Sequence, residues 1–256
     1  MTDSNKKRDI LISKALSYLL RHGAIKEQLN IGTDGYVLLN ELLQHNRLKS
    51  HKATKQDIIR IVATNDKQRF QLERLENDDG ILLEEYKIRA TQGHSIKSIE
   101  NDKILVKIND YPYDSLIHGT SLKNIILILK SCYGLSRMNR NHIHLSPGII
   151  GKDKYVISGM RYNTEIFIYL NFHRMMKDGG ITIYRSVNNV FLVEDNIPID
   201  YFEKIVYMVN KESNTGPQGG VVEKKQQELI QLCKEHGIKL LVVDNSFVPV
   251  IPDSGH

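Results

Sequence analysis

The residues best suited to chemistry in this 256-residue chain are three arginines and a histidine. Arg21 and His22 stand together in LSYLLRHG, Arg69 lies in NDKQRF, and Arg140 lies in SRMNRNH. A guanidinium group can hold two phosphate oxygens at once, and a histidine can add a charge-assisted bond or move a proton near neutral pH. We interpret Arg21-His22 as a phosphate clamp. A cation at a helix C-terminus also favours the helix dipole, so local sequence supports a capping role equally.

Two further polar strings could contact a ligand. QGHS contains Gln92, His94 and Ser95 and lies at the predicted join between two domains, where ligand sites are common. Its alternative is a connecting turn. HGT, residues 118–120, ends a predicted strand just before a helix. A glycine there lets the backbone approach a ligand closely, and the N–H groups of a helix start can receive an anion.

Several classes of enzyme lack their minimum equipment. His142 and His144 alternate along a predicted strand and face opposite sides, so they do not share a metal ion. The chain has no HExxH, GxSxG or GxxxxGK[ST] motif, no GxGxxG after a strand, and no clustered His/Asp/Glu set. We expect no metal. Cys132 and Cys233 form no CxxC pair, which fits a reducing compartment.

Composition indicates an ordinary globular protein, with 41% hydrophobic and 25% charged residues. The net charge of +5 and the pI of about 9.0 fit a basic surface as well as a nucleic-acid partner. The start, MTDSNKKRDI, has no apolar core of a signal peptide, and no apolar run approaches the ~18 residues of a membrane span. We therefore expect no membrane association and a location in the cytoplasm, the nucleus or both.

Residues 9–97 read as one domain after a disordered segment, residues 1–8. We expect a helix from an N-cap at Asp9, with an apolar face and a C′ stop at Gly23. VLLNELLQH predicts a second helix, and Thr54 opens a capping box before the helix DIIRIVATN. RFQLER and ILLEEYKI flank the turn ENDDG as a hairpin. Three helices and a hairpin are the order of a winged helix, which binds nucleic acid or protein.

The texture becomes β-rich over residues 98–210, with one clear helix, SLKNIILILKSC. Six short apolar runs predict strands: KILVKI, SLIHGT, NHIHLS, EIFIYLNF, ITIYRS and NNVFLV. Residues 211–256 form a linker, KESNTGPQGG, and a C-terminal extension with a helix, a strand (IKLLVV) and a frayed tail. The fold class is therefore α+β.

The strings in this order resemble the tRNA 2′-phosphotransferase family. They run from about Arg8 to about Val209 and comprise LSYLLRH, NDKQRF, ATQGHSI, LIHGT, RNHIHLSPG, SGMR and SVNNVFL. The resemblance implies an N-terminal winged-helix lobe and a C-terminal ADP-ribosyltransferase-like, β-rich lobe. It also implies NAD as co-substrate, a tRNA bearing a splice-junction 2′-phosphate as substrate, and a role in the last step of tRNA splicing. We expect a monomer.

The resemblance implies two chemical steps. The RNA 2′-phosphate displaces nicotinamide from NAD, and the ribose 2″-hydroxyl then attacks that phosphorus. The products are 2′-OH RNA, nicotinamide and ADP-ribose 1″,2″-cyclic phosphate. The substrates supply both attacking oxygens, so the protein must position and neutralise a phosphate. The family's essential Arg, His, Arg and Arg fall on Arg21, His22, Arg69 and Arg140. His22 either orients the phosphate or moves the 2″-hydroxyl proton.

The remaining site residues also come from the resemblance. His118 is expected at the adenosine ribose, and His144 near the nicotinamide. Val190 stands where protein-modifying relatives have a catalytic glutamate, so a protein acceptor is not expected. The full NAD-binding set is His118, Gly119, Thr120, His144, Ser146, Gly148, Arg161 and Val190. Gln92, His94 and Ser95 are expected around the substrate phosphate.

Two other functions fit parts of the pattern. One is an NAD-dependent ADP-ribosyltransferase acting on phosphorylated nucleic-acid ends, which would stop after the first step. The other is a winged-helix binding module with an inactive transferase lobe. Retention of Arg21, His22, Arg69 and Arg140 speaks against the inactive module. The products formed from NAD and a 2′-phosphorylated oligonucleotide distinguish the two enzymatic functions.

Overall fold

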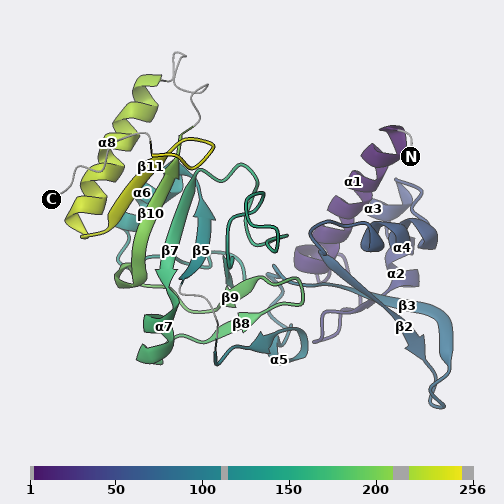
Figure 1. Ribbon diagram of the computed structural model, residues 1–256. Helices are drawn as coiled ribbons and strands as arrows, with labels where there is room; N and C mark the ends of the chain where they lie inside the picture. The colour runs from purple at the N-terminus through teal and green to yellow at the C-terminus, as the bar shows by residue number, and fades with distance from the viewer. Residues whose placement is uncertain (1–2, 111–114, 210–218, 250–256) are drawn as a thin grey trace. The chain divides into compact units, whose positions relative to one another are not determined.

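The computed structural model of the protein describes residues 3–110, 115–209 and 219–249 and has a mixed α+β fold (Figure 1). The chain divides into two compact units. The helical unit comprises Met1–Lys107, Asn139–His142 and Arg185–Asn188, and the sheet unit comprises the rest. The division therefore comes after Lys107 rather than near residue 97. The two short returning segments could not be predicted, because each lies within a β-rich run of the sequence.

The helical unit begins with helices and ends in a small antiparallel sheet. Strand β3 lies between β1 and β2, and Phe70 of β2 pairs with Ala90 of β3. The predicted hairpin around ENDDG is confirmed. The elements are α1 (Asp3–Tyr18), η1 (Leu19–Gly23), β1 (Val37–Leu38), α2 (Leu39–Gln44), α3 (Asn46–Lys49), α4 (Lys55–Ala63), β2 (Phe70–Glu76), β3 (Leu82–Ala90), α5 (Asn101–Ile104) and β4 (Val106–Lys107).

Helix α1 buries the apolar stripe that the sequence predicts, since Ile12 and Leu16 are fully buried. Its predicted ends were wrong. The helix begins at Asp3, so residues 3–8 are helical rather than disordered. Asp9 does not cap it, because its carboxylate accepts a 2.7 Å bond from Arg60 of α4. Gly23 is not a left-handed C′ residue either. It ends a π-helical turn, and the Tyr18 ring lies where its Cβ would be.

Helix α4 has the predicted capping box. The Asp57 N–H donates to the Thr54 hydroxyl, and the Asp57 carboxylate accepts from the Thr54 N–H at 3.0 Å. The same carboxylate is nearly buried and accepts bonds of 2.6 and 3.0 Å from Arg8 of α1. The Arg8 guanidinium, first among several donors, holds the pKa of Asp57 far below its usual range. This ion pair fastens α1 to α4.

The sheet unit is built around the four strands β11, β10, β7 and β5, in that order. Strands β5, β7 and β10 are antiparallel neighbours, whereas β11 is parallel to β10. Strands β6 and β9 form a second antiparallel pair. The elements are β5 (Ser115–Thr120), α6 (Leu122–Lys130), β6 (Ile143–Leu145), β7 (Ile166–Asn171), α7 (Phe172–Asp178), β8 (Ile183–Arg185), β9 (Phe191–Val193), η2 (Ile199–Tyr201), β10 (Phe202–Met208), α8 (Gly219–Glu235) and β11 (Lys239–Val243).

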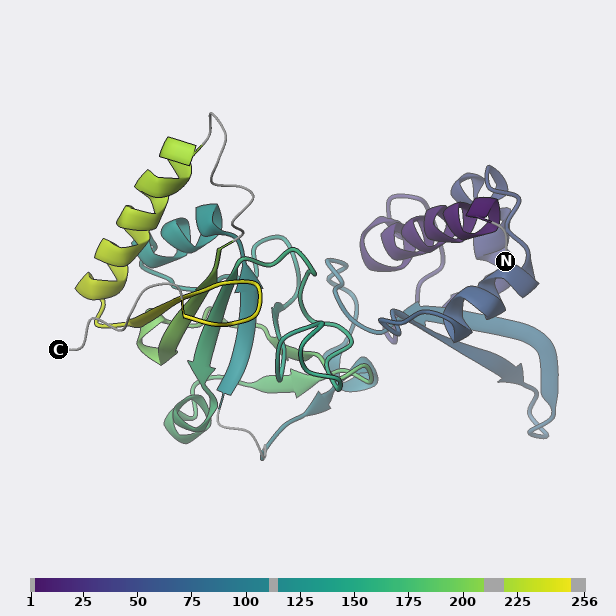
Figure 2. The same cartoon turned by 45° about the horizontal axis from the view of Figure 1, so that its top comes forward.

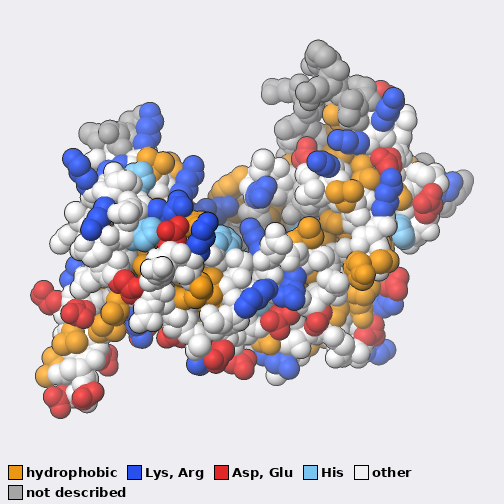
Figure 3. Space-filling model, turned by 180° about the vertical axis from the view of Figure 1, so that it is seen from behind, with side chains coloured by type: hydrophobic (Ala, Val, Ile, Leu, Met, Phe, Trp, Pro, Cys, Tyr) orange, Lys and Arg blue, Asp and Glu red, His pale blue; other side chains and the backbone are white. Residues whose placement is uncertain are grey.

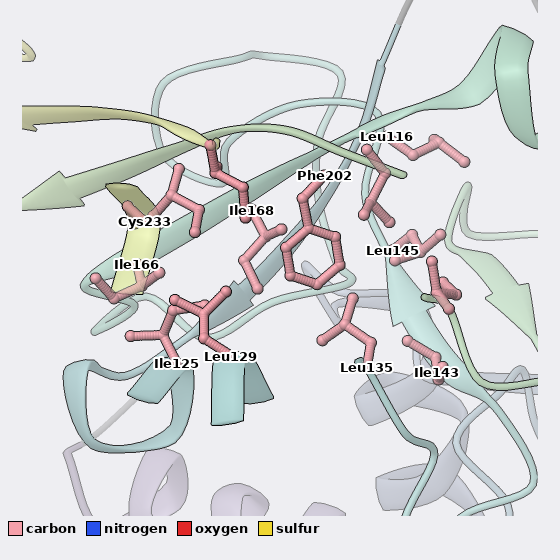
Figure 4. Close-up of a cluster of buried hydrophobic side chains, with 14 of the residues drawn as sticks. Leu116, Ile125, Leu129, Leu135, Ile143, Leu145, Ile166, Ile168, Phe202 and Cys233 are labelled. Atoms are coloured by element: carbon pink, nitrogen blue, oxygen red, sulfur yellow. The ribbon is translucent and has the colours of Figure 1, made fainter. Parts of the chain in front are cut away.

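Alternating side chains build a core on each face of this sheet. Ile166 and Ile168 of β7 point into the larger core, whereas Phe167 between them points into the smaller one. Helices α6 and α8 pack side by side over the larger core (Figure 2). Their Leu129 and Cys233 side chains meet the sheet there (Figure 4).

The C-terminal segment is part of this core rather than an added extension. Leu229 of α8 is fully buried, and Val242 of β11 lies in the same cluster. The predicted helix and strand are confirmed, and both contribute side chains to the larger core of the sheet unit. Part of the predicted linker, residues 210–218, and the end of the predicted tail, residues 250–256, lie outside the described residues. No helix within the described ranges is long and apolar enough to cross a membrane.

Candidate active site

A single π-helical turn, η1, carries Arg21 and His22 at the end of α1. A π turn has one more residue than an α turn, so it re-aims the side chains that follow, and such turns often occur at functional sites. Leu19 and Leu20 are fully buried and fix this turn to the core. The Tyr18 ring packs directly against Gly23 and leaves no space for a Cβ there. The turn therefore has one well-defined geometry.

The Arg21 side chain is the most unusual feature of the helical unit. Its Nε and Nη2 atoms are buried, and neither has a hydrogen-bond partner among the described residues. Burial first, and then the charges of Arg69 and Arg140, lower the pKa of Arg21 to about 10. Gly93, at φ +88°, brings the backbone so close that a Cβ there would lie 3.6 Å from the guanidinium group. The fold thus holds a charged side chain ready for an anion it does not itself provide.

Arg69 is held at the start of β2 by a short loop. Its N–H donates to Asn65 Oδ1 at 3.1 Å, and its Nη1 donates to the same oxygen at 3.4 Å. Gln68, just before it, has φ +44°, a left-handed conformation that non-glycine residues rarely adopt. The Thr91 hydroxyl donates to the Gln68 carbonyl at 3.0 Å. The strained backbone therefore serves to place Arg69 beside Arg21.

Arg140 joins this group from a distant part of the sequence. The next residue, Asn141, donates its N–H to the His94 carbonyl at 2.8 Å. The Asn141 amide also donates to the Ile96 carbonyl at 2.9 Å and accepts from Lys97 at 3.1 Å. These bonds fasten Arg140 to the segment that contains QGHS, and its charge acts on both Arg21 and His22.

His22 is oriented by Ser95. Its Nδ1 and the Ser95 hydroxyl share a hydrogen bond of 2.9 Å. The Ser95 N–H donates to the Arg21 carbonyl at 2.9 Å, and its hydroxyl lies 3.5 Å from the same carbonyl. Burial, followed by the charges of Arg140 and Arg21, lowers the pKa of His22. The imidazole is therefore biased toward its neutral form.

His94 and Gln92 lie behind these groups, both almost fully buried. Burial first, then the positive charge of Arg21, lowers the pKa of His94 to about 3. The ring is thus neutral at physiological pH, and its Nε2 is buried with no hydrogen-bond partner in the described chain. His142 also contributes to this shift. A neutral histidine here supports the cluster without adding another positive charge.

The structure thus brings the four predicted catalytic residues into one unit. The charges of Arg69 and Arg140 act on Arg21, and those of Arg140 and Arg21 act on His22. Lys and Arg side chains gather near histidines on this unit in the space-filling view (Figure 3). Burial, and then the positive charges of Arg69 and Arg140, lower the pKa of Arg21. An arrangement of this kind binds a dianionic group such as a phosphate monoester.

The predicted NAD-binding residues lie in the sheet unit, mainly on β5 and β6. His118 shares a hydrogen bond of 2.9 Å between its Nδ1 and the His144 carbonyl, and Ile117 pairs with Ser146 through backbone bonds of 2.8 Å. The Ser146 hydroxyl is fully buried and has no partner among the residues that the structure describes. The sequence strings HGT and HIHLS therefore do converge.

The other predicted NAD-binding residues have clear local surroundings. A Cβ at Gly119 would lie 2.9 Å from the Met160 Cβ, so glycine is needed there for packing within the protein. Gly148 precedes a turn in which Ile149 donates its N–H to Asp153 at 2.7 Å. Arg161 is exposed, whereas Val190, just before β9, is fully buried. Thr120 ends β5, one residue before the Ser121 cap of α6.

Three residues that position the site were not identified from the sequence. Asn65 accepts bonds from Arg69, and Asn141 anchors the backbone beside Arg140 through its bond to the Ile96 carbonyl. Asn188 donates its amide to the Lys67 carbonyl at 2.9 Å and so supports the Arg69 loop. The only signal was their place within or beside the strings NDKQRF, RNHIHLSPG and SVNNVFL. Within the described ranges, no three His, Cys, Asp or Glu side chains are grouped to hold a metal ion.

Comparisons with known proteins show the family to which the chain belongs. The family model described as "RNA 2'-phosphotransferase, Tpt1 / KptA family" matches residues 7–195. The "tRNA 2'-phosphotransferase" of Saccharomyces cerevisiae is 45% identical over 237 residues, 91% of this chain and 95% of that protein. The unmatched 9% is about 23 residues, fewer than the 46 residues from 211 to 256, so the similarity reaches into α8 or β11.

Other relatives match about three quarters of this chain. The "tRNA 2'-phosphotransferase 1" of Danio rerio is 42% identical over 191 residues, 74% of this chain and 80% of that protein. The "Probable RNA 2'-phosphotransferase" of Acaryochloris marina is 34% identical over 194 residues, 76% of this chain and 96% of that protein.

Proposed function

Because the chain belongs to the RNA 2′-phosphotransferase, Tpt1 / KptA family, we propose that its arginine cluster holds the 2′-phosphate of a tRNA splice junction during transfer to NAD. The chain is a tRNA 2′-phosphotransferase of an NAD-dependent family, and it removes the splice-junction 2′-phosphate. The observation that carries our assignment of the phosphate site is Arg21, whose buried Nε and Nη2 lack partners among the described residues.

The arginines neutralise the phosphate. A guanidinium fork can donate two parallel bonds to phosphate oxygens, and three such groups exceed the charge of one phosphate dianion. A bound dianion also offsets the repulsion from Arg69 and Arg140, which adds to burial in lowering the pKa of Arg21. We assign Arg21, Arg69 and Arg140 to hold the phosphate and to stabilise charge that develops on it as its bonds change.

His22 is placed to move a proton. The Ser95 hydroxyl has its own acceptor in the Arg21 carbonyl at 3.5 Å, so it can receive a bond from Nδ1–H of His22. That tautomer leaves the lone pair of Nε2 as the acceptor for a hydroxyl proton. The lowered pKa keeps the imidazole neutral and ready for this task. Ser95 is then a positioning residue for His22, and His94 and Gln92 support the segment behind it.

The sheet unit has a polar group that fits a nucleotide ligand. The buried Ser146 hydroxyl lacks a partner among the described residues and lies where β6 joins β5, beside His118. When bound, NAD supplies an electrophilic sugar carbon with nicotinamide as leaving group, and a ribose hydroxyl that can take the phosphorus. We assign His118, Thr120, His144 and Ser146 to hold it. Gly119, Gly148 and Arg161 belong to the same proposed set.

Val190 accounts for the choice of acceptor. Its fully buried side chain is apolar, so this position supplies no carboxylate to deprotonate a protein acceptor. A phosphate acceptor is already an anion and needs no such base. We also assign the helical unit as a winged-helix lobe, on its order of helices followed by a β2–β3 hairpin, and the sheet unit as an ADP-ribosyltransferase-like lobe. The products are then 2′-OH tRNA, nicotinamide and ADP-ribose 1″,2″-cyclic phosphate.

Arg140→Ala tests the phosphate site. We expect kcat/KM for a 2′-phosphorylated oligonucleotide to fall at least about 100-fold, since removing one such donor typically costs this much. Arg140 is exposed, so the thermal unfolding temperature should change little. Arg137→Ala is the matched control, because it removes an exposed arginine three residues away. Equal activity of the two variants would contradict the assignment of Arg140.

A further inference from the structure

A groove of about 440 Å³ in the helical unit is lined by residues of α1, of the end of α4 and of the loop after α4. Helix α1 forms one wall, and the end of α4 with the loop after it forms the other. The volume falls within the roughly 300–1,000 Å³ of sites that bind small ligands. Arg69, which the proposed function assigns to the substrate phosphate, is one of its lining residues. The polar and basic side chains that line it are Ser13, Lys14, Ser17, Thr64, Asn65 and Arg69.

The residues that α1 contributes to the groove form a stripe along the helix, and all but Ile10 are polar or charged. Ile10, Ser13, Lys14 and Ser17 are spaced three, four and seven residues from the first, so they lie on one face of the helix. The core-facing stripe is a different one, headed by Ile12, which is fully buried. By contrast, Ile10 is an apolar side chain that is 54% exposed, at a position where a polar residue would also be tolerated. This face of α1 thus presents the hydroxyls of Ser13 and Ser17, the ammonium group of Lys14 and the apolar side chain of Ile10.

The charge of this groove is positive. Its acidic residue, Asp9, is neutralised by Arg60 through bonds of 2.7 and 3.4 Å. Lys14 and Arg69 then provide the net charge. Asn65 both lines the groove and accepts two bonds from Arg69, so the groove and the phosphate cluster share Arg69.

We propose that this groove binds a nucleotide that flanks the splice junction, with Lys14 on its backbone phosphate and Ser13, Ser17 and Thr64 on its ribose and phosphate oxygens. The inference rests on the proposed role of Arg69 in holding the 2′-phosphate. Hydroxyl and ammonium groups suit the sugar-phosphate backbone, whose contacts carry no sequence information directly. Ile10 offers an apolar surface to any base. We therefore expect binding here to depend little on sequence.

The other end of the helical unit does not suit a phosphate backbone. The tip of the β2–β3 hairpin is acidic (Figure 3), and its exposed carboxylates are Glu76, Asp78, Asp79, Glu84 and Glu85. These charges repel RNA, so the strand leaves the phosphate cluster along α1 rather than along the hairpin. A single strand that enters a polar groove beside its reacting phosphate gains positioning as well as affinity.

Lys14→Ala tests the groove with two substrates. One is a hexanucleotide with an internal 2′-phosphate, and the other is a single nucleoside 2′-phosphate without a flanking nucleotide. We expect KM for the hexanucleotide to rise about 5–10-fold while its kcat stays within about twofold. The rise for the single nucleotide should be much smaller. Lys14→Arg should restore most of the affinity, and Lys49→Ala, which removes an exposed lysine of α3, is the matched control.

Direct binding gives a second readout. The slope of log Kd against log salt for the hexanucleotide should decrease by about 0.7 in Lys14→Ala, as expected for one lost backbone contact with a single strand. Equal effects on both substrates would place Lys14 at the reacting phosphate and overturn the proposal. Unchanged KM and slope would also overturn it and leave the groove to a different occupant. Arg69→Ala distinguishes failure of the groove proposal from failure of the proposed phosphate site, because full activity of that variant would refute the assigned role of Arg69.

Discussion

Arg21→Met should stabilise the ligand-free protein while it removes activity. The Arg21 guanidinium is buried beside Arg69 and Arg140, and its pKa is lowered to about 10. An ordinary arginine has a pKa of about 12.5 or above, and each pKa unit corresponds to about 1.4 kcal/mol, so keeping Arg21 charged costs the folded state about 3 kcal/mol. The penalty is present at neutral pH, because the proton stays bound below pH 10. Methionine keeps much of the apolar stem and drops the charge.

The expected gain in unfolding free energy is about 1–2 kcal/mol, since replacing a buried charge with an apolar residue of similar size is often stabilising by about 1–4 kcal/mol. The activity should fall about 100- to 1,000-fold. Urea denaturation at pH 7 measures the first effect, with Arg137→Met as the control for loss of an exposed arginine. A nucleoside 2′-phosphate should stabilise the wild type and not the variant. A loss of 1 kcal/mol or more in Arg21→Met would refute the reasoning, because it would make Arg21 a structural residue.

Three further predictions concern positioning and stability. Ser95→Ala should lower kcat about 10-fold with KM for NAD unchanged, because His22 loses its 2.9 Å partner; equal kcat in steady-state assays would contradict this. Asp57→Asn should lower the unfolding free energy by about 2–3 kcal/mol at pH 7. The folded-state pKa of Asp57 is depressed. The difference in unfolding free energy between wild type and variant should therefore be full above about pH 4 and shrink as the pH falls further. A difference that stays constant with pH in denaturation curves would count against this ion pair. Leu229→Ala should destabilise the sheet unit by about 2–5 kcal/mol, whereas a peripheral α8 would show no change in thermal unfolding.

Local rules in the sequence predicted much of the fold. The capping box from Thr54 to Asp57 depends on two residues three apart, so it could be read directly. The apolar stripe of α1 and the alternation of β7 between two cores follow from helix and strand periodicity. These features need no information about distant contacts.

Features that depend on distant contacts could not be predicted. The π turn at Arg21 is fixed partly by the N–H of Ser95, 74 residues later in the chain. Arg140 joins the helical unit because Asn141 bonds to the His94 carbonyl, which no local pattern indicates. The start of α1 was missed because its first residues are polar, and Arg8 gains its partner, Asp57, only in the folded protein. The predicted site residues come from the family resemblance, and the structure adds what positions Arg21, His22, Arg69 and Arg140 within the helical unit.

The central claim is that Arg21, His22, Arg69 and Arg140 form one phosphate-transfer site. The most direct measurement is analysis of the products from the full chain incubated with NAD and an oligonucleotide bearing an internal 2′-phosphate. We predict 2′-OH RNA, nicotinamide and ADP-ribose 1″,2″-cyclic phosphate in equal amounts. Accumulation of ADP-ribosylated RNA without 2′-OH product, or no consumption of NAD, would contradict this account.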